Sequence, residues 1–476
     1  MNLNRRSFCA GLASAAGLAA GPAGAQPAGA PRLFEPRPVA LALPGAARPV
    51  EAWGFDGATP GPLLRLRHGE LVNLRLVNSL RAPLALHWQG VRIDNAFDGA
   101  PPLTGPATAP GATADLRFTP PDPGLFAYRP GLGAAAAEQL DRGLTGLLIV
   151  DEPAPPPVDH DVVAVVDDWR LGPDGAIRAD FADPAIVRGA GRVGAIVTVN
   201  GRPAPETLAA RPGARVRLRL CNAANARLLI VSFLGVRPFI LAIDGQPCDP
   251  FEPVRQTVPV GPGARFDIAF EMPAAGAAGS IVARGATPPG LSALPDLPLV
   301  VLAPTGDPAP PRAEPIALPL NPALPPAIRL QDARRVELVL EGGAALPAGL
   351  GQALAMGYMP AAAGRPAAPP PWRLNGHAGE GLPAAPLVSV KRGTPVSMAF
   401  VNRTSFPQTM HVHGHVMRLL HPLDDGWEPY WRDSVIVPEG KTSRVAFLAD
   451  NPGRWLVAST SPERQAAGLA AWFEVT

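Results

Sequence analysis

The sequence predicts an all-β protein built from three Greek-key β-sandwich domains. Three observations support this: short segments in which apolar and polar residues alternate, turns rich in proline and glycine between them, and a phrase that recurs three times. Alternation of period two is typical of half-buried strands, and strands that recur about every 8–12 residues are typical of sandwiches. The clearest alternating segments are Leu63–Arg67, Leu71–Leu76, Ala214–Leu220 and Ser443–Phe447.

The recurring phrase places a glycine turn before a strand and an asparagine after it. It leads from His68-Gly69 to Asn78, from Pro212-Gly213 to Asn222, and from Arg392-Gly393 to Asn402. Three copies predict three related domains, because self-similarity along a chain marks repeated structural units. We expect these domains over residues 32–153, 156–304 and 333–476, with a proline-rich linker over 305–332.

Composition narrows the classes of function. The 476 residues carry a formal net charge of +2 and show no basic run, so nucleic acid is not an expected partner. The mature chain has no apolar run of the roughly 20 residues that cross a bilayer, so we expect no transmembrane anchor.

The N-terminus has the features of an export signal. The pair Arg5-Arg6 precedes a weakly apolar run, and Ala23-Gly24-Ala25 fits a small-x-small cleavage rule. We therefore predict that residues 1–25 are a twin-arginine signal peptide and that the mature chain is periplasmic. Cys221 and Cys248 remain after cleavage, and they could pair in that compartment or lie buried as apolar residues.

A cluster of histidines is the strongest candidate for a metal site. The chain has eight histidines, and four of them fall between positions 411 and 421. Because residues i, i+2 and i+4 of a strand share a face, the imidazoles of His411, His413 and His415 are expected to point together.

The chain resembles the three-domain multicopper oxidases over essentially its whole mature length. Leu86–Gly90 is similar to that family's first His-Trp-His-Gly motif, and Leu125–Gly131 lies where a His-x-His motif belongs. Further similar segments are Asp94–Gly99, Glu138–Val150, Trp431–Val435 and Asn451–Trp455. The resemblance implies cupredoxin-like domains, a type 1 copper held by two histidines and a cysteine, and a trinuclear cluster held by eight histidines.

Carried over position by position, the resemblance leaves three copper ligands. His87 and His411 fall on the type 2 positions and His413 on a type 3 position, while His415 and His421 are expected beside the site or at the surface. The other trinuclear positions hold Gln89, Arg129, Gly131, Ala458 and Thr460, and the type 1 positions hold Gln408, Ser459, Arg464 and Leu469. The expected cofactor is therefore either none or a single copper ion at His87, His411 and His413.

These replacements predict a multicopper-oxidase-like protein without laccase-type activity. An arginine stays protonated and offers only donors, so Arg129 opposes a metal cation. We expect Arg129 to form a buried ion pair with Asp98 or Glu463. The first functional prediction is a non-catalytic periplasmic scaffold or binding protein with a protein partner, for which an exported cell-division member of the superfamily is a precedent. The alternative is a residual mononuclear copper protein or oxidoreductase that uses the type 2 position.

Overall fold

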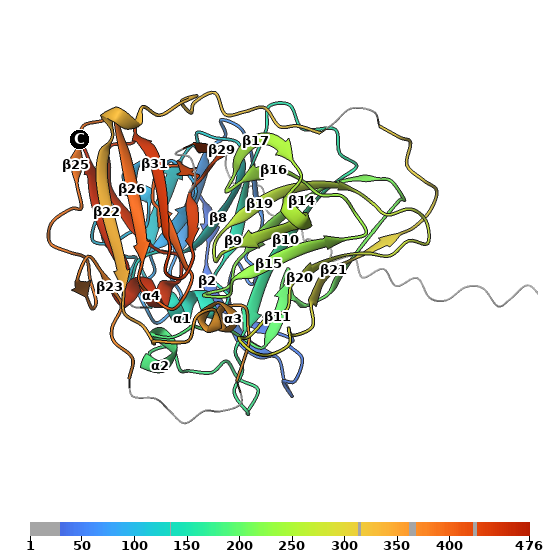
Figure 1. Ribbon diagram of the computed structural model, residues 1–476, viewed down its shortest axis with the longest axis horizontal. Helices are drawn as coiled ribbons and strands as arrows, with labels where there is room; N and C mark the ends of the chain where they lie inside the picture. The colour runs from blue at the N-terminus through green and yellow to red at the C-terminus, as the bar shows by residue number, and fades with distance from the viewer. Residues whose placement is uncertain (1–28, 134, 313–315, 361–367, 422–425) are drawn as a thin grey trace, which may run out of the picture.

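The computed structural model describes residues 29–133, 135–312, 316–360, 368–421 and 426–476, and regular structure in them is mostly strand (Figure 1). The prediction of an all-β fold is confirmed. All four segments in which alternation is clearest lie in strands, apart from their first residues Leu63, Leu71 and Ala214. The predicted signal peptide, residues 1–25, lies outside the described residues.

Strands β1 to β9 form three small sheets, with the orders β1-β5-β7, β2-β3 and β4-β9-β8-β6. Their apolar faces enclose one core around Phe34, Trp88 and Tyr128. The strands are β1 Arg32–Phe34, β2 Pro36–Leu41, β3 Val50–Phe55, β4 Leu64–Arg67, β5 Val72–Val77, β6 Leu86–Gln89, β7 Thr113–Phe118, β8 Gly124–Pro130 and β9 Gly146–Asp151.

Strands β10 to β21 form a seven-stranded sheet, β12-β11-β10-β14-β19-β16-β17, and a five-stranded sheet, β13-β21-β20-β15-β18. The strands are β10 His160–Trp169, β11 Ile196–Val199, β12 Arg202–Pro203, β13 Glu206–Ala210, β14 Arg215–Asn222, β15 Leu229–Leu234, β16 Phe239–Ile243, β17 Gln246–Phe251, β18 Thr257–Val260, β19 Arg265–Glu271, β20 Gly279–Ala283 and β21 Leu297–Pro304.

Strands β22 to β33 repeat this arrangement in a seven-stranded sheet, β24-β23-β22-β26-β31-β28-β29, and a five-stranded sheet, β25-β33-β32-β27-β30. The strands are β22 Arg334–Glu341, β23 Arg373–Leu374, β24 His377–Ala378, β25 Ser389–Val390, β26 Thr394–Asn402, β27 Gln408–Val412, β28 Met417–Leu420, β29 Trp427–Arg432, β30 Ser434–Val437, β31 Thr442–Ala449, β32 Gly453–Ser459 and β33 Ala470–Val475.

The described helices are short and lie between strands. Figure 1 shows α1, α2, α3 and α4 gathered at one edge of the molecule, and α1 packs against α4. The α-helices are α1 Ala136–Asp141, α2 Pro184–Val187, α3 Leu350–Ala355 and α4 Pro462–Ala466, and the 3-10 turns are η1 Asn95–Phe97, η2 Val254–Gln256 and η3 Leu330–Asp332. No described helix has the length and apolar content needed to cross a membrane.

The asparagine of the recurring phrase has a structural role in all three copies. Asn78, Asn222 and Asn402 are buried, and the side-chain oxygen of each accepts a hydrogen bond from the backbone N–H two residues later. The side-chain amide of each donates to carbonyls of the loops around it. The asparagine thus satisfies backbone groups that the loop would otherwise leave buried without partners.

The proline-rich segment after β21 lies against the second pair of sheets. Within its described part, Ile316 and Leu318 are buried with Leu241, and the Arg312 guanidinium donates to Asp159 at 2.7 Å. Only η3 is regular in this part. The domain boundaries stay predictions, as does the linker's assignment as an extended connection.

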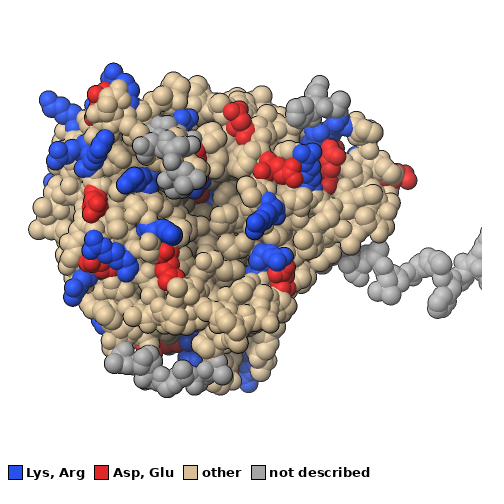
Figure 2. All heavy atoms as spheres, in the orientation of Figure 1, with Lys and Arg blue, Asp and Glu red and all other residues tan. Residues whose placement is uncertain are grey.

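The surface in Figure 2 carries lysine and arginine side chains interspersed with aspartate and glutamate. In Figure 1, the orange and red strands and the green strands lie at opposite sides, with blue and cyan strands between them. The rings of His87 in β6 and His411 in β27 meet, with their centroids 5.4 Å apart.

Candidate metal centre

Three imidazoles from distant parts of the chain meet in the interior. His87 lies in β6, His411 lies in β27, and His413 follows β27 directly. One ring nitrogen of each lies within 4.8 Å of the others, and the ring centroids of His87 and His413 are 4.0 Å apart. Each of the three residues is 4% exposed or less. The structure thus brings together the three residues that the sequence proposed as metal ligands.

His415 does not share this face, so that part of the strand prediction is wrong. The strand β27 ends at Val412, and Gly414 turns the chain with φ +68°. His415 then packs among Phe447, Trp455 and Phe473. The period-two rule fails because it holds only while the backbone stays extended. His421 is exposed at the end of β28.

The second nitrogen of each imidazole is held by an oxygen. The Nδ1 atom of His87 lies 2.8 Å from the carbonyl oxygen of Asp98, and that of His411 lies 2.8 Å from the carbonyl oxygen of Asp433. The Nδ1 atom of His413 lies 2.9 and 3.1 Å from the two carboxylate oxygens of Asp98. A carbonyl oxygen can only accept, so in the neutral imidazoles Nδ1 carries the proton and Nε2 carries the lone pair.

Burial favours this neutral state for His413. Burial lowers the pKa of His413 to about 3, against the raising effect of the Asp98 carboxylate. Burial also opposes ionisation of Asp98, yet His413 and His87 hold its pKa well below the ordinary value. At neutral pH, His413 is therefore a neutral imidazole that donates to an ionised Asp98.

Asp433 and Arg265 are site residues that the sequence did not single out. The Asp433 carboxylate lies 3.1 Å from Nδ1 of His411 and forms a buried ion pair with the Arg265 guanidinium. Burial opposes ionisation of Asp433, but Arg265 and then His411 hold its pKa well below the ordinary value. The sequence marks the segment that contains Asp433 only by its resemblance to the family, because no spacing rule connects it to a histidine 22 residues earlier.

The three imidazoles line a cavity of about 20 Å³, together with Gln89, Arg129, Pro130, Gly131, Ser459, Thr460 and Gln465. A cavity needs roughly 10–15 Å³ to hold one water molecule, so this space suits a single occupant of about that size, such as one metal ion. The Nε2 atoms of His87 and His411 are buried and have no hydrogen-bond partner among the described residues. Imidazole lone pairs in this arrangement suit copper or zinc, so the residues present fit one metal ion.

Arg129 is the residue of the cavity that opposes a cation. It lies directly opposite His87 in the β6–β8 ladder, so both side chains share a face. Its guanidinium donates to the side-chain oxygen of Gln89 at 3.2 Å and to the carbonyl oxygen of Thr460 at 2.7 Å. Burial lowers the pKa of Arg129 to about 10, which still leaves it protonated at neutral pH.

The expected ion pair between Arg129 and Asp98 or Glu463 is not present, so that hypothesis is wrong. Asp98 is engaged by His413 and His87. Glu463 accepts from the backbone N–H of Arg192 at 2.8 Å and lies 3.5 Å from the side-chain amide of Asn225. Both carboxylates have nearer donors, and these hold them away from the guanidinium.

At the positions that the resemblance assigns to the type 1 copper, Arg464 is packed among neutral groups. Its guanidinium donates to the side-chain oxygen of Gln408 at 2.9 Å and to the carbonyl oxygens of Pro407, Gly189 and Ala190. Its centre lies 5.2 Å from the ring of Trp372 and 5.4 Å from that of Phe406. Ser459 and Leu469, which flank Arg464 in the sequence, are also buried. These side chains offer a copper ion neither imidazole nor thiolate.

Cys221 and Cys248 are both free and buried. Of the two alternatives for these cysteines, the structure has the buried apolar one. Burial raises the pKa of each thiol to about 12, so neither is a thiolate at neutral pH.

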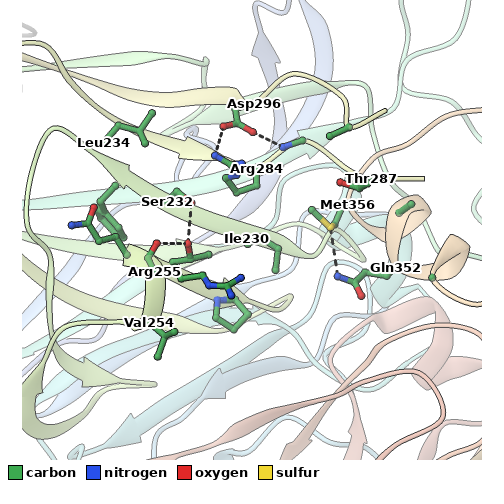
Figure 3. Close-up of a pocket in the computed structure, with 18 residues that line it drawn as sticks. Ile230, Ser232, Leu234, Val254, Arg255, Arg284, Thr287, Asp296, Gln352 and Met356 are labelled. Carbon is green, nitrogen blue, oxygen red and sulfur yellow. Dashed lines mark hydrogen bonds and ion pairs between the residues drawn. The ribbon is translucent and has the colours of Figure 1, made fainter. Parts of the chain in front are cut away.

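A larger cavity lies elsewhere and contains no motif that the sequence singled out. It measures about 820 Å³ and opens between β15, β18, β20 and the α3 region. Figure 3 shows the Arg284–Asp296 ion pair on one wall, with Gln352 and Met356 on another. No residue lines both this cavity and the imidazole cavity.

Two family models match this chain, and both are described as multicopper oxidase. One matches residues 42–155 and the other residues 360–476. These ranges contain β6 and β27, the two strands that carry the imidazoles.

Curated relatives agree with this match. A multicopper oxidase of Mycobacterium tuberculosis, MmcO, is 27% identical over 91% of this chain and 85% of its own length. The cell division protein FtsP of Edwardsiella tarda is 30% identical over 57% of this chain and 60% of its own length.

Solved structures show the same fold. A multicopper oxidase from Pseudomonas thermotolerans covers 93% of this chain and 98% of its own, with 28% identity and a TM-score of 0.74. Lac15, from a marine microbial metagenome, covers 94% of this chain and all of its own, with 30% identity and a TM-score of 0.71.

Proposed function

This chain belongs to the multicopper oxidase superfamily, and we propose that it is an exported copper-binding member that holds one copper ion between His87, His411 and His413. The observation that carries the proposal is the pair of buried Nε2 atoms on His87 and His411 that have no partner among the described residues. A buried polar atom without a partner costs about 1–3 kcal/mol, and a metal ion at this point removes that cost.

The surroundings of the imidazoles support this proposal. Asp98 and Asp433 orient the rings through Nδ1, which is the usual arrangement for histidines that ligate a metal through the other nitrogen. A copper ion in this position supplies a Lewis acid and a one-electron redox centre. The chain itself holds His413 neutral, fixes the orientation of the three imidazoles and excludes bulk water from the cavity.

We further propose that the chain lacks laccase-type oxidase activity. That activity needs a type 1 centre for electron entry, and Gln408, Ser459 and Arg464 stand where the ligands of such a centre are expected. The Arg464 guanidinium already has carbonyl and aromatic neighbours, so it neither ligates a metal nor leaves room for one.

The second candidate is a copper-free scaffold in the periplasm, and Arg129 favours it. A protonated guanidinium in the wall of the cavity repels a divalent cation. The similarity to a cell division protein supports the same candidate. Export by the twin-arginine pathway and a periplasmic protein partner belong to both candidates as proposals.

Metal content distinguishes the two. The full chain is loaded with Cu²⁺, dialysed, and measured by mass spectrometry and electron paramagnetic resonance. We expect about one copper per chain with a spectrum of nitrogen ligands, loss of most of it in His411→Ala, and full retention in His68→Ala. His68 is the control because its imidazole is exposed, lies 3.1 Å from the carbonyl oxygen of Pro121 and does not line the cavity. A wild-type chain that keeps no copper contradicts the proposal and leaves the scaffold.

A further inference from the structure

Exposed apolar side chains gather around one part of the surface. Among the described residues, eleven large apolar side chains are exposed, and five of them line two cavities of about 820 and 350 Å³. The five are Leu234 and Val254 in the larger cavity and Leu294, Leu297 and Met359 in the smaller one. Soluble proteins rarely expose contiguous apolar surface, and where they do, it marks a place where another molecule binds.

The two cavities are neighbours, because Arg284, Gly285 and Met356 line both of them. Figure 3 shows Leu234 and Val254 on one side of the larger cavity and Met356 on the other. Methionine side chains adapt their shape to what they contact, which suits a surface that binds apolar groups. We call the lining of the two cavities the apolar surface.

The backbone at the rim of the larger cavity is strained. Arg255 and Gln256 have φ angles of 54° and 52°, and both residues line this cavity. Positive φ crowds the Cβ atom against the backbone in any residue other than glycine, and such strain is concentrated at sites of binding and catalysis. The preceding residue, Val254, is 84% exposed. The chain thus uses a costly conformation at the point where it presents an apolar side chain to solvent.

The unpaired charge of the apolar surface is Arg255. The other charged residues of the lining have partners: Arg284 pairs with Asp296 at 2.8 Å, and Arg227 pairs with Asp168 at 2.8 Å. In the part of the chain that the structure describes, no carboxylate lies within ion-pair distance of Arg255. The surface therefore has one uncompensated positive charge beside its apolar side chains, and a carboxylate on a partner complements it.

The strand β18 limits the way in which a partner can bind. It pairs only with β15 in the described sheet, so its other edge has no partner strand there. Pro259 lies in β18 and lines the larger cavity, and it has no N–H to donate to an added strand. Side chains that enter the cavities are therefore a better fit than a further strand. A lipid bilayer fits less well, because its flat surface does not fill a cavity.

We propose that the apolar surface binds a segment of another protein that carries apolar side chains and a nearby carboxylate. The apolar side chains occupy the two cavities, and the carboxylate pairs with Arg255 at the rim. Val254 packs against the bound segment. The inference does not depend on the proposed copper site, because no residue of the apolar surface lines the imidazole cavity.

The experiment measures the binding of short, labelled synthetic peptides to the full chain by fluorescence polarisation. Each peptide of the library carries leucines and one aspartate at a different spacing. Each has two counterparts, one with asparagine in place of the aspartate and one with serine in place of the leucines. We expect saturable binding of the leucine–aspartate peptides whose spacing matches the surface, and at least about tenfold weaker binding of both counterparts.

Variants of the chain locate the binding. Arg255→Glu should bind the matching leucine–aspartate peptides at least about tenfold more weakly and should prefer peptides in which lysine replaces the aspartate. Val254→Asp should weaken the binding of both kinds. Arg202→Glu is the control for charge and Leu71→Asp the control for an exposed apolar side chain, because both residues are exposed and line neither cavity. Circular dichroism checks that each variant is folded.

The outcomes are distinct. A library in which no leucine–aspartate peptide binds more tightly than its counterparts overturns the proposal. Equal affinity of the wild type and a folded Arg255→Glu chain for these peptides overturns the role of the charge. Sedimentation and binding to phosphatidylglycerol vesicles test two other occupants. Self-association or vesicle binding that Val254→Asp abolishes, without peptide binding, assigns the surface to a second copy or to a membrane and overturns the protein segment.

Discussion

Asp98 contacts two of the three imidazoles, with its carboxylate at His413 and its backbone and side chain at His87. Hydrogen bonds to the nitrogen opposite a metal fix the tautomer and the orientation of the ring, and their removal typically weakens metal binding about 10–100-fold. We therefore expect Asp98→Asn to lower copper affinity by that factor while the chain stays folded. Competition with a calibrated chelator measures it. Asp115→Asn, at an exposed ion pair, is the control and should leave copper affinity unchanged.

His413 makes stability depend on pH in the metal-free chain. Burial lowers its pKa from the ordinary 6.5 to about 3, so the unfolded chain takes up a proton near pH 6.5 that the folded chain refuses. The stability that neutral His413 contributes is present above pH 6.5 and is lost as the pH falls towards 3. Each pH unit in that window costs about 1.4 kcal/mol, which gives about 2 kcal/mol at pH 5.

Other buried groups change stability with pH in the opposite direction. The prediction is therefore tested by the difference between the wild type and a variant that lacks His413. Burial raises the pKa of Asp141 to about 6, and its contribution therefore grows as the pH falls from 6 towards 4. Urea unfolding of the wild type and of His413→Asn between pH 5 and 7.5 gives a difference in unfolding free energy. The contributions of groups that both chains share cancel in this difference. The wild type should lose about 2 kcal/mol more than the variant over this range. Parallel pH profiles would contradict the role of His413.

At the scale of elements, much of the fold could be predicted from local pattern. Apart from the first residues of three of them, the segments Leu63–Arg67, Leu71–Leu76, Ala214–Leu220 and Ser443–Phe447 lie in β4, β5, β14 and β31, because alternation depends only on neighbours along the chain. The turn after His413 could not be predicted in this way. It depends on Gly414, where a Cβ would collide with the ring of Trp455 from another strand.

The partners of the charged residues were equally beyond sequence reasoning. The site histidines were found because they cluster and because they match a motif. The contact between Asp433 and His411 is set by geometry between strands, and so is the absence of a carboxylate partner for Arg129 among the described residues. Charge alone predicted an ion pair between Arg129 and Asp98 or Glu463. In the structure, His413 lies against Asp98 and the backbone of Arg192 donates to Glu463 instead.

The exit of β8 is an element whose packing shapes the metal site. A Cβ at Gly131 would collide with the carbonyl oxygen of Gly99 and lie 3.3 Å from the Cβ of His87. Backbone atoms cannot yield as a side chain does, so Gly131→Ala must displace the segment that holds Asp98. We expect it to cost about 1–3 kcal/mol of stability and to reduce copper retention, as thermal unfolding and metal analysis would record.

Gly133→Ala is the matched control for this element. Gly133 lies two residues further on, and a Cβ there meets no atom within 4 Å. Equal unfolding temperatures and copper contents for the two variants would show that close packing at Gly131 has no part in the site.

At the scale of the whole molecule, Arg265 connects three groups of strands at one point. It lies in β19, forms a buried ion pair with Asp433 ahead of β30, and donates to the carbonyl oxygen of Leu125 in β8 at 3.2 Å. Burial opposes its charge, but Asp433 and then Asp244 raise its pKa above the ordinary value. Because Asp433 also holds His411, the packing of the sandwiches is coupled to the orientation of a metal ligand.

Arg265→Leu should therefore weaken both stability and metal binding. It leaves the Asp433 carboxylate buried without its cation, a change that typically costs about 3–5 kcal/mol. An exposed pair provides the comparison: Arg237→Leu removes the partner of Glu252 at the surface and should cost about 0–1 kcal/mol. Urea unfolding gives the stability of both variants. The copper content of the Arg265→Leu chain, taken at urea concentrations below its unfolding midpoint, measures the coupling between sandwich packing and metal binding. A variant as unstable as expected that keeps full copper affinity would show that the sandwiches are held together independently of the imidazole site.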